Sequence, residues 1–295
     1  MRMPEGFAEF IGRYFEGKIQ KISVNAAFPC PNRDGSKGVG GCIYCNNAAF
    51  SPGYTLKHPS VREQIEQGRR FFSRKYPTMR YLAYFQSYTS TNGDVDRLMA
   101  MYEEALAQPG VVGLVIGTRP DCMPQRLLDN LAQLRSQGTF VMIEYGAETS
   151  HDKTLDRINR CHHWEETEDA VRRTHEAGIP VGLHLIMGLP GETREEMLQT
   201  IDAVNGLPVD MVKIHQMQVI RGTRLAAQYE AGEAEITTWK LEDYLEFCCR
   251  IIKRLRPGIA VERFVSSSPA DMLVAPRWGV KNYEFAERLR RKLGD

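Results

Sequence analysis

The sequence lacks any long apolar run. No stretch among its 295 residues reaches the ~18–20 consecutive apolar residues of a membrane-spanning helix. The first ten residues, MRMPEGFAEF, also lack the apolar centre of a secretory signal peptide. These absences argue against a membrane or secreted protein, so we expect a cytoplasmic protein with no membrane partner.

Cysteine is sparse as well. Seven cysteines in 295 residues do not make a disulfide-dense chain, and no secretory signal precedes them. A disulfide framework is therefore not expected. In a reducing compartment the thiols stay free and can act as ligands for a metal or a cluster.

The charge is almost balanced, with 38 Lys and Arg against 37 Asp and Glu, a net charge of +1. No broad field therefore attracts a nucleic acid, and any such contact must be local. Two basic patches are candidates, although basic helical faces are usually only solvated: Arg69–Arg70–Arg74–Lys75 and Arg288–Arg290–Arg291–Lys292. Low-complexity segments and Ser/Gly linkers are also missing, so disordered linkers are not expected.

Short apolar, β-branched runs recur, bounded by Gly, Pro or polar residues as buried parallel strands are. They cover 21–28, 80–86, 111–118, 139–147, 180–189 and 211–220, with helical patterns at about 60–75, 94–108, 124–137, 165–177 and 193–205. Six β/α repeats predict an α/β fold, a partial (β/α)6 barrel over residues 1–228 with an N-terminal entry segment. Residues 229–295 read as a C-terminal α/β extension packed on it, with a helix near 238–255, a strand at 259–266 and a final helix at 283–293.

The most informative stretch follows the first predicted strand: CPNRDGSKGVGGCIYC, residues 30–45. Eleven residues separate Cys30 from Cys42 and two separate Cys42 from Cys45. Three thiolates can hold a 4Fe-4S cluster while one iron stays open to a ligand. Zinc is the competing reading, but structural zinc wants four ligands, and Cys122 and Cys161 are isolated. The spacing by itself leaves both open.

With Tyr44 before its last cysteine, this stretch resembles the cluster loop of radical S-adenosylmethionine (SAM) enzymes. The commonest spacing in that family has three residues in the first gap, so the eleven here resemble the longer loop of the YtqA/YhcC-type subfamily. The segments IGTRPDC (116–122), GLHLIMGLPGET (182–193) and KIHQMQVIRGTRLA (213–226) carry the same likeness. The resemblance covers essentially the whole chain.

The resemblance implies a partial barrel with a 4Fe-4S cluster on Cys30, Cys42 and Cys45 that binds SAM. One electron from a reductase or flavodoxin-type donor would cleave SAM to a 5′-deoxyadenosyl radical, which abstracts a hydrogen atom. The favoured substrate is bacterial transfer RNA, with the side chain on C5 of a wobble uridine trimmed from carboxymethylaminomethyl to aminomethyl. A small metabolite or peptide substrate is the alternative. A zinc- or cluster-stabilised interaction protein is the alternative of another class.

The strand ends supply candidates for binding the cofactor. Gln86 and Thr89 follow the second strand, where many relatives carry a Gly-Gly-Glu segment that meets the methionine amino group. Glu148 and Arg160 match a segment of the elongator catalytic subunit and the oxygen-independent coproporphyrinogen oxidase, and an Arg there can pair with the SAM carboxylate. Tyr44 is expected at the same cofactor. Ordinary strand-end packing, or a surface pair of Glu148 with Arg160, is the structural alternative.

Further polar residues interrupt the predicted strands themselves. Glu144 lies in an apolar strand, so we expect it to face the lumen and meet a cation or hydroxyl. His184 matches a polar position of the nucleoside pocket in relatives. Alternation places Lys213 and His215 on one face of the sixth strand, where they are candidates for substrate contact or proton transfer. Arg119 is a candidate for anion recognition. Core packing and salt bridges are the alternative for these side chains.

Overall fold

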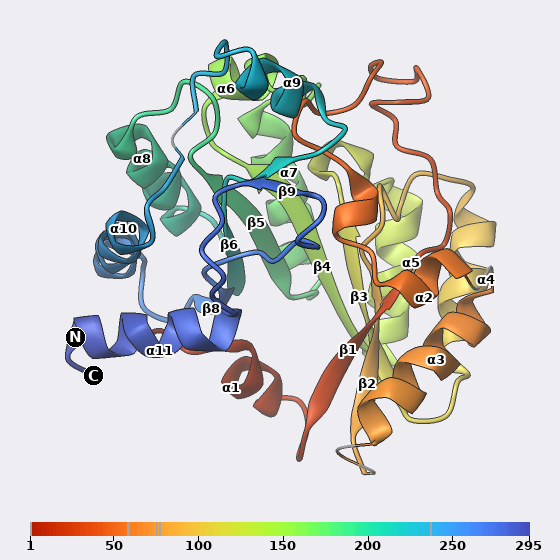
Figure 1. Ribbon diagram of the computed structural model, residues 1–295. Helices are drawn as coiled ribbons and strands as arrows, with labels where there is room; N and C mark the ends of the chain where they lie inside the picture. The colour runs from red at the N-terminus through yellow and green to blue at the C-terminus, as the bar shows by residue number, and fades with distance from the viewer. Residues whose placement is uncertain (1, 58–59, 75, 77, 237) are drawn as a thin grey trace.

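The computed structural model describes residues 2–57, 60–74, 76, 78–236 and 238–295. In this part of the chain one sheet of seven parallel strands follows the order of the sequence. Figure 1 shows the sheet curving with its helices on the outside. The expected partial α/β barrel is confirmed. Its strands are β1 (Ile19–Val24), β2 (Arg80–Phe85), β3 (Val111–Thr118), β4 (Phe140–Glu148), β5 (Val181–Met187), β6 (Met211–Gln216) and β8 (Ala260–Arg263).

Some of the helices between the strands begin at a polar residue whose side chain satisfies one of their first N–H groups. Ser60, Asp94 and Thr193 accept backbone N–H groups at three of these starts. Among the described residues, every helix is too short or too polar to span a bilayer. The crossover helices are α3 (Val61–Ser73), α4 (Val95–Leu106), α5 (Gln125–Ser136), α7 (Trp164–Glu176), α8 (Arg194–Asn205) and α10 (Leu241–Arg254). Shorter elements are α2 (Gly53–Lys57), α6 (Asp152–Arg157), α9 (Arg224–Glu230) and the 3-10 turns η1 (Asn47–Ala49) and η2 (Pro120–Cys122).

The amino end of the barrel interior is closed by the entry helix α1 (Phe7–Gly12). Phe10 and Ile11 are buried against Leu82, Phe140 and Met211, which belong to β2, β4 and β6. Apolar contacts therefore fill the lower half of the lumen, and polar side chains are left for the other half. The floor of any site in the barrel is set by this helix.

Two predicted strands differ from the structure. The first leaves the sheet after Val24, because 25–28 turn into the cysteine loop. The sixth is split: β6 ends at Gln216, and β7 (Val219–Ile220) pairs antiparallel with β9 (Leu273–Ala275) in a separate two-stranded sheet. The sequence shows residues 211–220 as one continuous predicted strand, so it gave no sign of the break.

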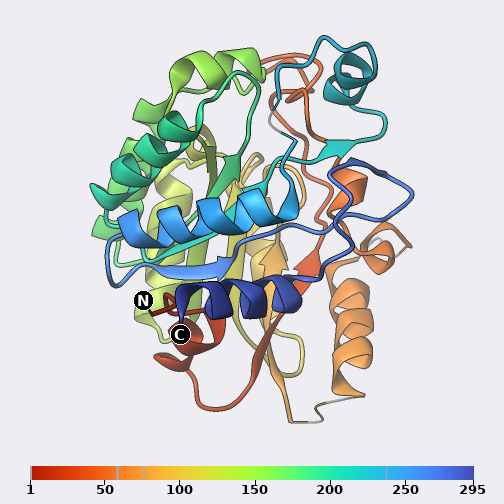
Figure 2. The ribbon, with the colours of Figure 1, turned by 60° about the vertical axis from the view of Figure 1, so that its left-hand side comes forward.

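The C-terminal segment adds β8 as the seventh strand, parallel to β6. An aromatic cluster fastens α10 and α11 (Asn282–Leu293) to the barrel, with ring centroids of Tyr244 and Phe285 5.6 Å apart. Trp239 Nε1 donates to the Met187 carbonyl of β5 at 3.0 Å. Figure 2 shows α10 and α11 lying one above the other on the same side. The domain boundary near residue 228 stays a prediction.

The final helix lies away from the mouth of the barrel. Figure 1 shows α11 beside α1 and near both termini, at the end opposite the cysteine loop. The backbone N–H of Met3 donates to Asp295 Oδ2 at 2.8 Å, which fixes this arrangement. The basic patch of α11 is therefore remote from the mouth. Lys75 of the other predicted patch lies outside the described residues.

Candidate active site

A cavity of about 220 Å³ opens where the carboxyl ends of the parallel strands meet, the edge at which functional groups gather in such barrels. Glu148, Gln216 and Arg263 end β4, β6 and β8 and line it. Among the predicted site residues, Lys213 lines a neighbouring cavity instead. Those that line this cavity are Cys30, Cys42, Cys45, Tyr44, Gln86, Thr89, Glu144, Glu148, Arg160, His184 and His215.

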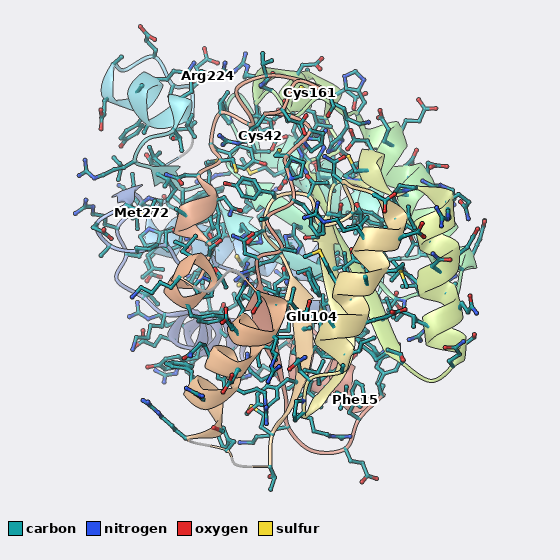
Figure 3. The ribbon with its side chains drawn as sticks, turned by 90° about the vertical axis from the view of Figure 1, so that its right-hand side faces the viewer. Phe15, Cys42, Glu104, Cys161, Arg224 and Met272 are labelled. Atoms are coloured by element: carbon teal, nitrogen blue, oxygen red, sulfur yellow. The ribbon has the colours of Figure 1, made fainter. Side chains whose placement is uncertain are left out.

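The cysteine loop is held by the segment that follows α6. Gly41 has a φ of 76° and donates its N–H to the Asn32 carbonyl at 2.7 Å, a turn that suits a residue without Cβ. Asn159 Nδ2 donates to the Gly41 carbonyl at 2.9 Å, and the Ile43 N–H donates to the Ile158 carbonyl at 3.0 Å. The loop is thus tied to residues more than a hundred positions away. Figure 3 shows Cys42 and Cys161 close together at this end of the molecule, with Phe15 at the other.

Two side chains direct N–H groups at the sulfur of Cys42. Asn32 Nδ2 and Arg160 Nη1 each lie 3.6 Å from Sγ, and the thiol is buried. The sulfur of Cys42 therefore lies within reach of one neutral and one cationic donor. Burial and the neighbouring Cys42 raise the pKa of Cys45 to about 11, with a smaller contribution from Cys30. The three sulfurs therefore influence one another across one wall of the cavity.

The three thiols do not surround a single point. Across the described ranges no group of three His, Cys, Asp or Glu side chains is set to hold one metal ion. A tetrahedral zinc site requires four donors at about 2.0–2.3 Å from one ion. A cluster has no such requirement, because each thiolate bonds its own iron.

Arg160 and Glu148 stand beside the cysteine loop. Arg160 Nη2 donates to the Gly146 carbonyl at 2.6 Å and lies 3.4 Å from Glu148 Oε1, while its buried Nε has no partner in the part of the chain that the structure describes. Burial lowers the pKa of Arg160, but Cys42 and Glu148 raise it well above its ordinary value. Burial and Glu148 also raise the pKa of Tyr44, which keeps that phenol protonated. The predicted pair is thus buried at the cavity and is not a solvated surface pair.

The strand-end loop after β2 presents one occupied and one free polar group. Gln86 Nε2 donates to Ser23 Oγ at 2.8 Å and to the Phe50 carbonyl at 3.2 Å. Thr89 is fully buried, and its Oγ1 has no hydrogen-bond partner among the described residues. Tyr88 between them has a φ of 58°, a strained value for a residue with a Cβ. Thr89 therefore remains open to a ligand, whereas Gln86 is engaged in holding the loop.

Glu144 is the centre of a buried ionic network. Its carboxylate, which is fully buried, lies 2.7 Å from Lys21 Nζ, 2.5 Å from Lys213 Nζ and 3.0 Å from His184 Nε2. Glu262 of β8 also pairs with Lys21 of β1 at 2.5 Å, although these edge strands share no backbone pairing. Lys213 is therefore committed to neutralising carboxylates. A proton-transfer role for it remains a prediction.

Two histidines share the inner wall, with ring centroids 5.5 Å apart. Burial and Lys213 lower the pKa of His184, although its contact with Glu144 opposes the shift. Burial and Arg263 hold the pKa of His215 well below its usual range, and its Nε2 has no partner in the described residues. Both rings are therefore neutral near pH 7. His215 is the one with a free nitrogen in the cavity.

Some residues at the site carried no signal in the sequence or were assigned differently. Asn32 and Asn159 hold the cysteine loop, but isolated asparagines in loops have no periodicity to reveal them. Arg263 was hidden in a predicted strand of the extension. Arg119 donates to both carboxylate oxygens of Asp121 at 2.9 Å, so most of its fork is already engaged.

The comparison with known proteins agrees with this geometry. Residues 35–204 match the Radical SAM superfamily. The chain belongs to the radical SAM superfamily. Residues 209–294 of this radical SAM enzyme match the Radical_SAM C-terminal domain. Protein YhcC of Escherichia coli is 38% identical over 98% of the chain and 92% of its own length, and YtqA of Bacillus subtilis is 33% identical over 95% and 86%. The resemblance found in the sequence is confirmed.

More distant matches concern part of the chain or the fold alone. A tRNA uridine(34) acetyltransferase of Methanocaldococcus jannaschii is 27% identical over 61% of this radical SAM chain and 32% of its own length. The solved structure of the archaeal Methanocaldococcus infernus Elp3 superposes with a TM-score of 0.67, at 19% identity, over 94% of this chain and 64% of the other. The latter likeness is one of fold.

The cavity suits the cofactors of the family. Radical SAM proteins use a 4Fe-4S cluster and SAM, and a buried polar atom without a partner is rare unless a ligand or water satisfies it. Such atoms here include Thr89 Oγ1, Arg119 Nη1, Arg160 Nε, His215 Nε2 and Arg263 Nε, all on residues that line the cavity. A polar, partly charged ligand such as SAM would satisfy donors of this kind.

Replacing Glu148 with Ala is expected to weaken SAM binding while iron content is retained. Loss of one charge-assisted contact costs about 1.5–3 kcal/mol, or roughly tenfold to a hundredfold in Kd. Arg160→Ala should weaken binding at least as much. Anaerobic calorimetry measures the Kd, and Glu165→Ala, at an exposed acid in the first turn of α7, is the matched control. An unchanged Kd in both site variants would contradict these contacts.

Proposed function

We propose that Cys30, Cys42 and Cys45 hold a 4Fe-4S cluster and that the adjoining cavity binds SAM and a wobble uridine of transfer RNA. The enzyme would trim the C5 side chain of that uridine from carboxymethylaminomethyl to aminomethyl. The observation that carries the proposal is one cavity lined by three loop cysteines and by buried polar atoms that have no partner among the described residues. The partial match to enzymes named for tRNA uridine 34 supports the RNA substrate.

When bound, the reduced cluster supplies the electron that cleaves SAM and so starts hydrogen-atom abstraction from the substrate. The residues of the chain do the remaining work. Asn32 and Arg160 donate toward the sulfur of Cys42 and so orient that ligand. Arg160 would take the SAM carboxylate and Glu148 the amino group or ribose hydroxyls. The floor formed by α1 and its apolar contacts excludes water from below.

The mouth has features that suit a single-stranded RNA loop. Phe50 is 42% exposed and Tyr88 is 43% exposed, and both line the cavity. Exposed aromatic rings at a cavity entrance are platforms on which an extruded base can stack. Arg221 and Arg224 are exposed next to the cysteine loop. The loop and α9 are joined there, since the Leu225 N–H donates to the Ile43 carbonyl at 2.9 Å.

A double variant, Arg221→Ala with Arg224→Ala, is therefore expected to make RNA binding less dependent on salt. Each lost phosphate contact should reduce the slope of log K against log salt by about 0.7–0.9. The affinity of the holoenzyme for an anticodon stem-loop is measured by fluorescence anisotropy. The salt concentration is varied between roughly 50 and 200 mM, a range over which phosphate contacts change the affinity strongly. Arg290→Ala with Arg291→Ala on the remote helix α11 is the control and should leave the slope unchanged. A slope that changes only in the Arg290/Arg291 variant would indicate that RNA binds at α11 instead.

The proposed reaction is tested by mass spectrometry of transfer RNA nucleosides from a strain that lacks the gene. Carboxymethylaminomethyluridine should accumulate and the aminomethyl product should disappear. Complementation with the intact gene should restore the product, whereas a Cys42→Ala gene should not. Unchanged nucleosides in the deletion strain would exclude this reaction and favour a small metabolite or peptide as substrate.

A further inference from the structure

Arg263 differs from the other arginines of the cavity in that its side chain has no hydrogen-bond or ion-pair partner among the described residues. Arg33 donates to the Cys45 carbonyl at 2.8 Å. Arg160 lies 3.4 Å from Glu148, and Arg119 lies 2.9 Å from Asp121. For Arg263, at the end of β8, no hydrogen bond or ion pair joins its side chain to any described residue, and its Nε is buried. The residue is half-buried and lines two cavities, so its Nη atoms are reachable from the cavity, while its buried Nε lacks an acceptor that a ligand could supply.

The carboxylates nearest in the fold are already used. Glu144 pairs with Lys21 and Lys213, and Glu262 pairs with the same two lysines at 2.5 and 3.4 Å. Two carboxylates therefore pair with two ammonium groups, and neither carboxylate is available to neutralise Arg263. A substrate would therefore meet a positively charged part of the cavity wall, in which both buried carboxylates already pair with lysines.

His215 adds a second free group on the adjacent strand. It lies on β6, which pairs with β8, and it faces the same cavity as Arg263. Its Nε2 is buried without a partner among the described residues. Arg263 also lines the second cavity, of about 450 Å³, between β1 and β8. Arg263 thus stands where the two cavities meet, and His215 lies on the side of the cysteine-lined cavity.

We infer that Arg263 and His215 bind a carboxylate of the substrate. The planar fork of arginine matches a carboxylate, and an imidazole N–H can donate to the same group. The inference rests on the proposed function, in which the group to be removed is a carboxymethyl. The SAM carboxylate has its own proposed partner, Arg160, beside Cys42. A substrate anchored by its carboxylate presents the adjoining C–H bonds to the cavity at a fixed position.

The test compares two anticodon stem-loops bound to the holoenzyme with SAM and without reductant. One carries carboxymethylaminomethyluridine and the other aminomethyluridine at the wobble position. The wild-type enzyme should prefer the carboxylate by about tenfold to a hundredfold, the size of one charge-assisted contact. Arg263→Gln should bring the ratio of the two Kd values close to one. Arg263→Lys should retain part of the preference, because the charge stays and the fork is lost.

Arg290→Gln, at an exposed arginine of the remote helix α11 that does not line the cavity, is the matched control and should keep the ratio. His215→Gln gives a second route to the answer if Arg263→Gln fails to fold, and it should also lower the ratio. A wild-type ratio near one, or a ratio unchanged in Arg263→Gln and His215→Gln, would overturn the inference while leaving the RNA substrate intact.

The free nucleosides of the same two kinds separate this inference from the proposed function. They carry no phosphate, so a phosphate contact of Arg263 cannot produce a preference between them. The enzyme could prefer the carboxylate nucleoside in a manner that depends on Arg263 and yet bind neither stem-loop. This result would support the carboxylate site and exclude RNA as the substrate. Absence of the preference with both probes would overturn the carboxylate site.

Discussion

Cys30→Ala, Cys42→Ala and Cys45→Ala should each abolish the visible absorbance of the cluster and all reductive cleavage of SAM. Each thiolate bonds one iron, and a fourth iron must stay open for SAM, so the loop has no ligand to spare. Cys161 has its thiol 3.0 Å from Asn32 Oδ1 of the loop but does not line the cavity, so we expect no replacement of a lost ligand by it. Iron and sulfide analysis after anaerobic reconstitution measures the loss, together with chromatography of SAM cleavage products.

Cys249→Ala is the matched control for these variants. Cys249 lies on α10, is half-buried, and does not line the cavity. Its removal should leave iron content and cleavage unchanged. Retention of iron in Cys30→Ala would contradict the ligand assignment, and a zinc content that equals one ion per chain in wild type would replace the cluster with a zinc site.

Glu144→Gln should strongly destabilise the barrel interior. The change leaves Lys21 and Lys213 with one carboxylate instead of two, and their side chains are only 9% and 2% exposed. Breaking a buried ion pair in this way costs about 3–5 kcal/mol. The shift of the urea midpoint of the apoprotein measures it. Glu287→Gln, on the surface of α11, removes exposed pairs and should leave the midpoint unchanged.

The difference between wild type and Glu144→Gln should also depend on pH. Burial raises the pKa of Glu144, but Lys21 and Lys213 outweigh it and hold that pKa well below the ordinary 4.5. A carboxyl with a depressed folded-state pKa stabilises the fold above its unfolded-state value, and this stability is lost as the pH falls through the folded-state value. The two midpoints should therefore differ fully near neutral pH and converge in acid. A constant difference would contradict the ionic assignment.

Local patterns were enough to predict the barrel and its cofactor loop. Buried parallel strands are short apolar runs, and the crossover helices have polar starts, so both kinds of element can be found within ten or fifteen residues. The cysteine spacing is likewise contained in one loop, residues 30–45. That loop follows the first strand, and the structure places its three cysteines on the cavity at the carboxyl edge of the sheet.

The sequence by itself therefore determined the order of the elements, the α/β class, the family and the cysteine loop. Each of these depends on residues that are close together in the chain. Tertiary structure decided which side chains meet. Lys21 and Glu144 are 123 positions apart, and Asn32 and Asn159 are 127 apart. Their contacts follow from strand register and loop docking, which no local period encodes. The same reason explains why β8 joined the sheet, why Lys213 became an ion-pair partner, and why Arg263 was left with an unneutralised charge in the cavity wall.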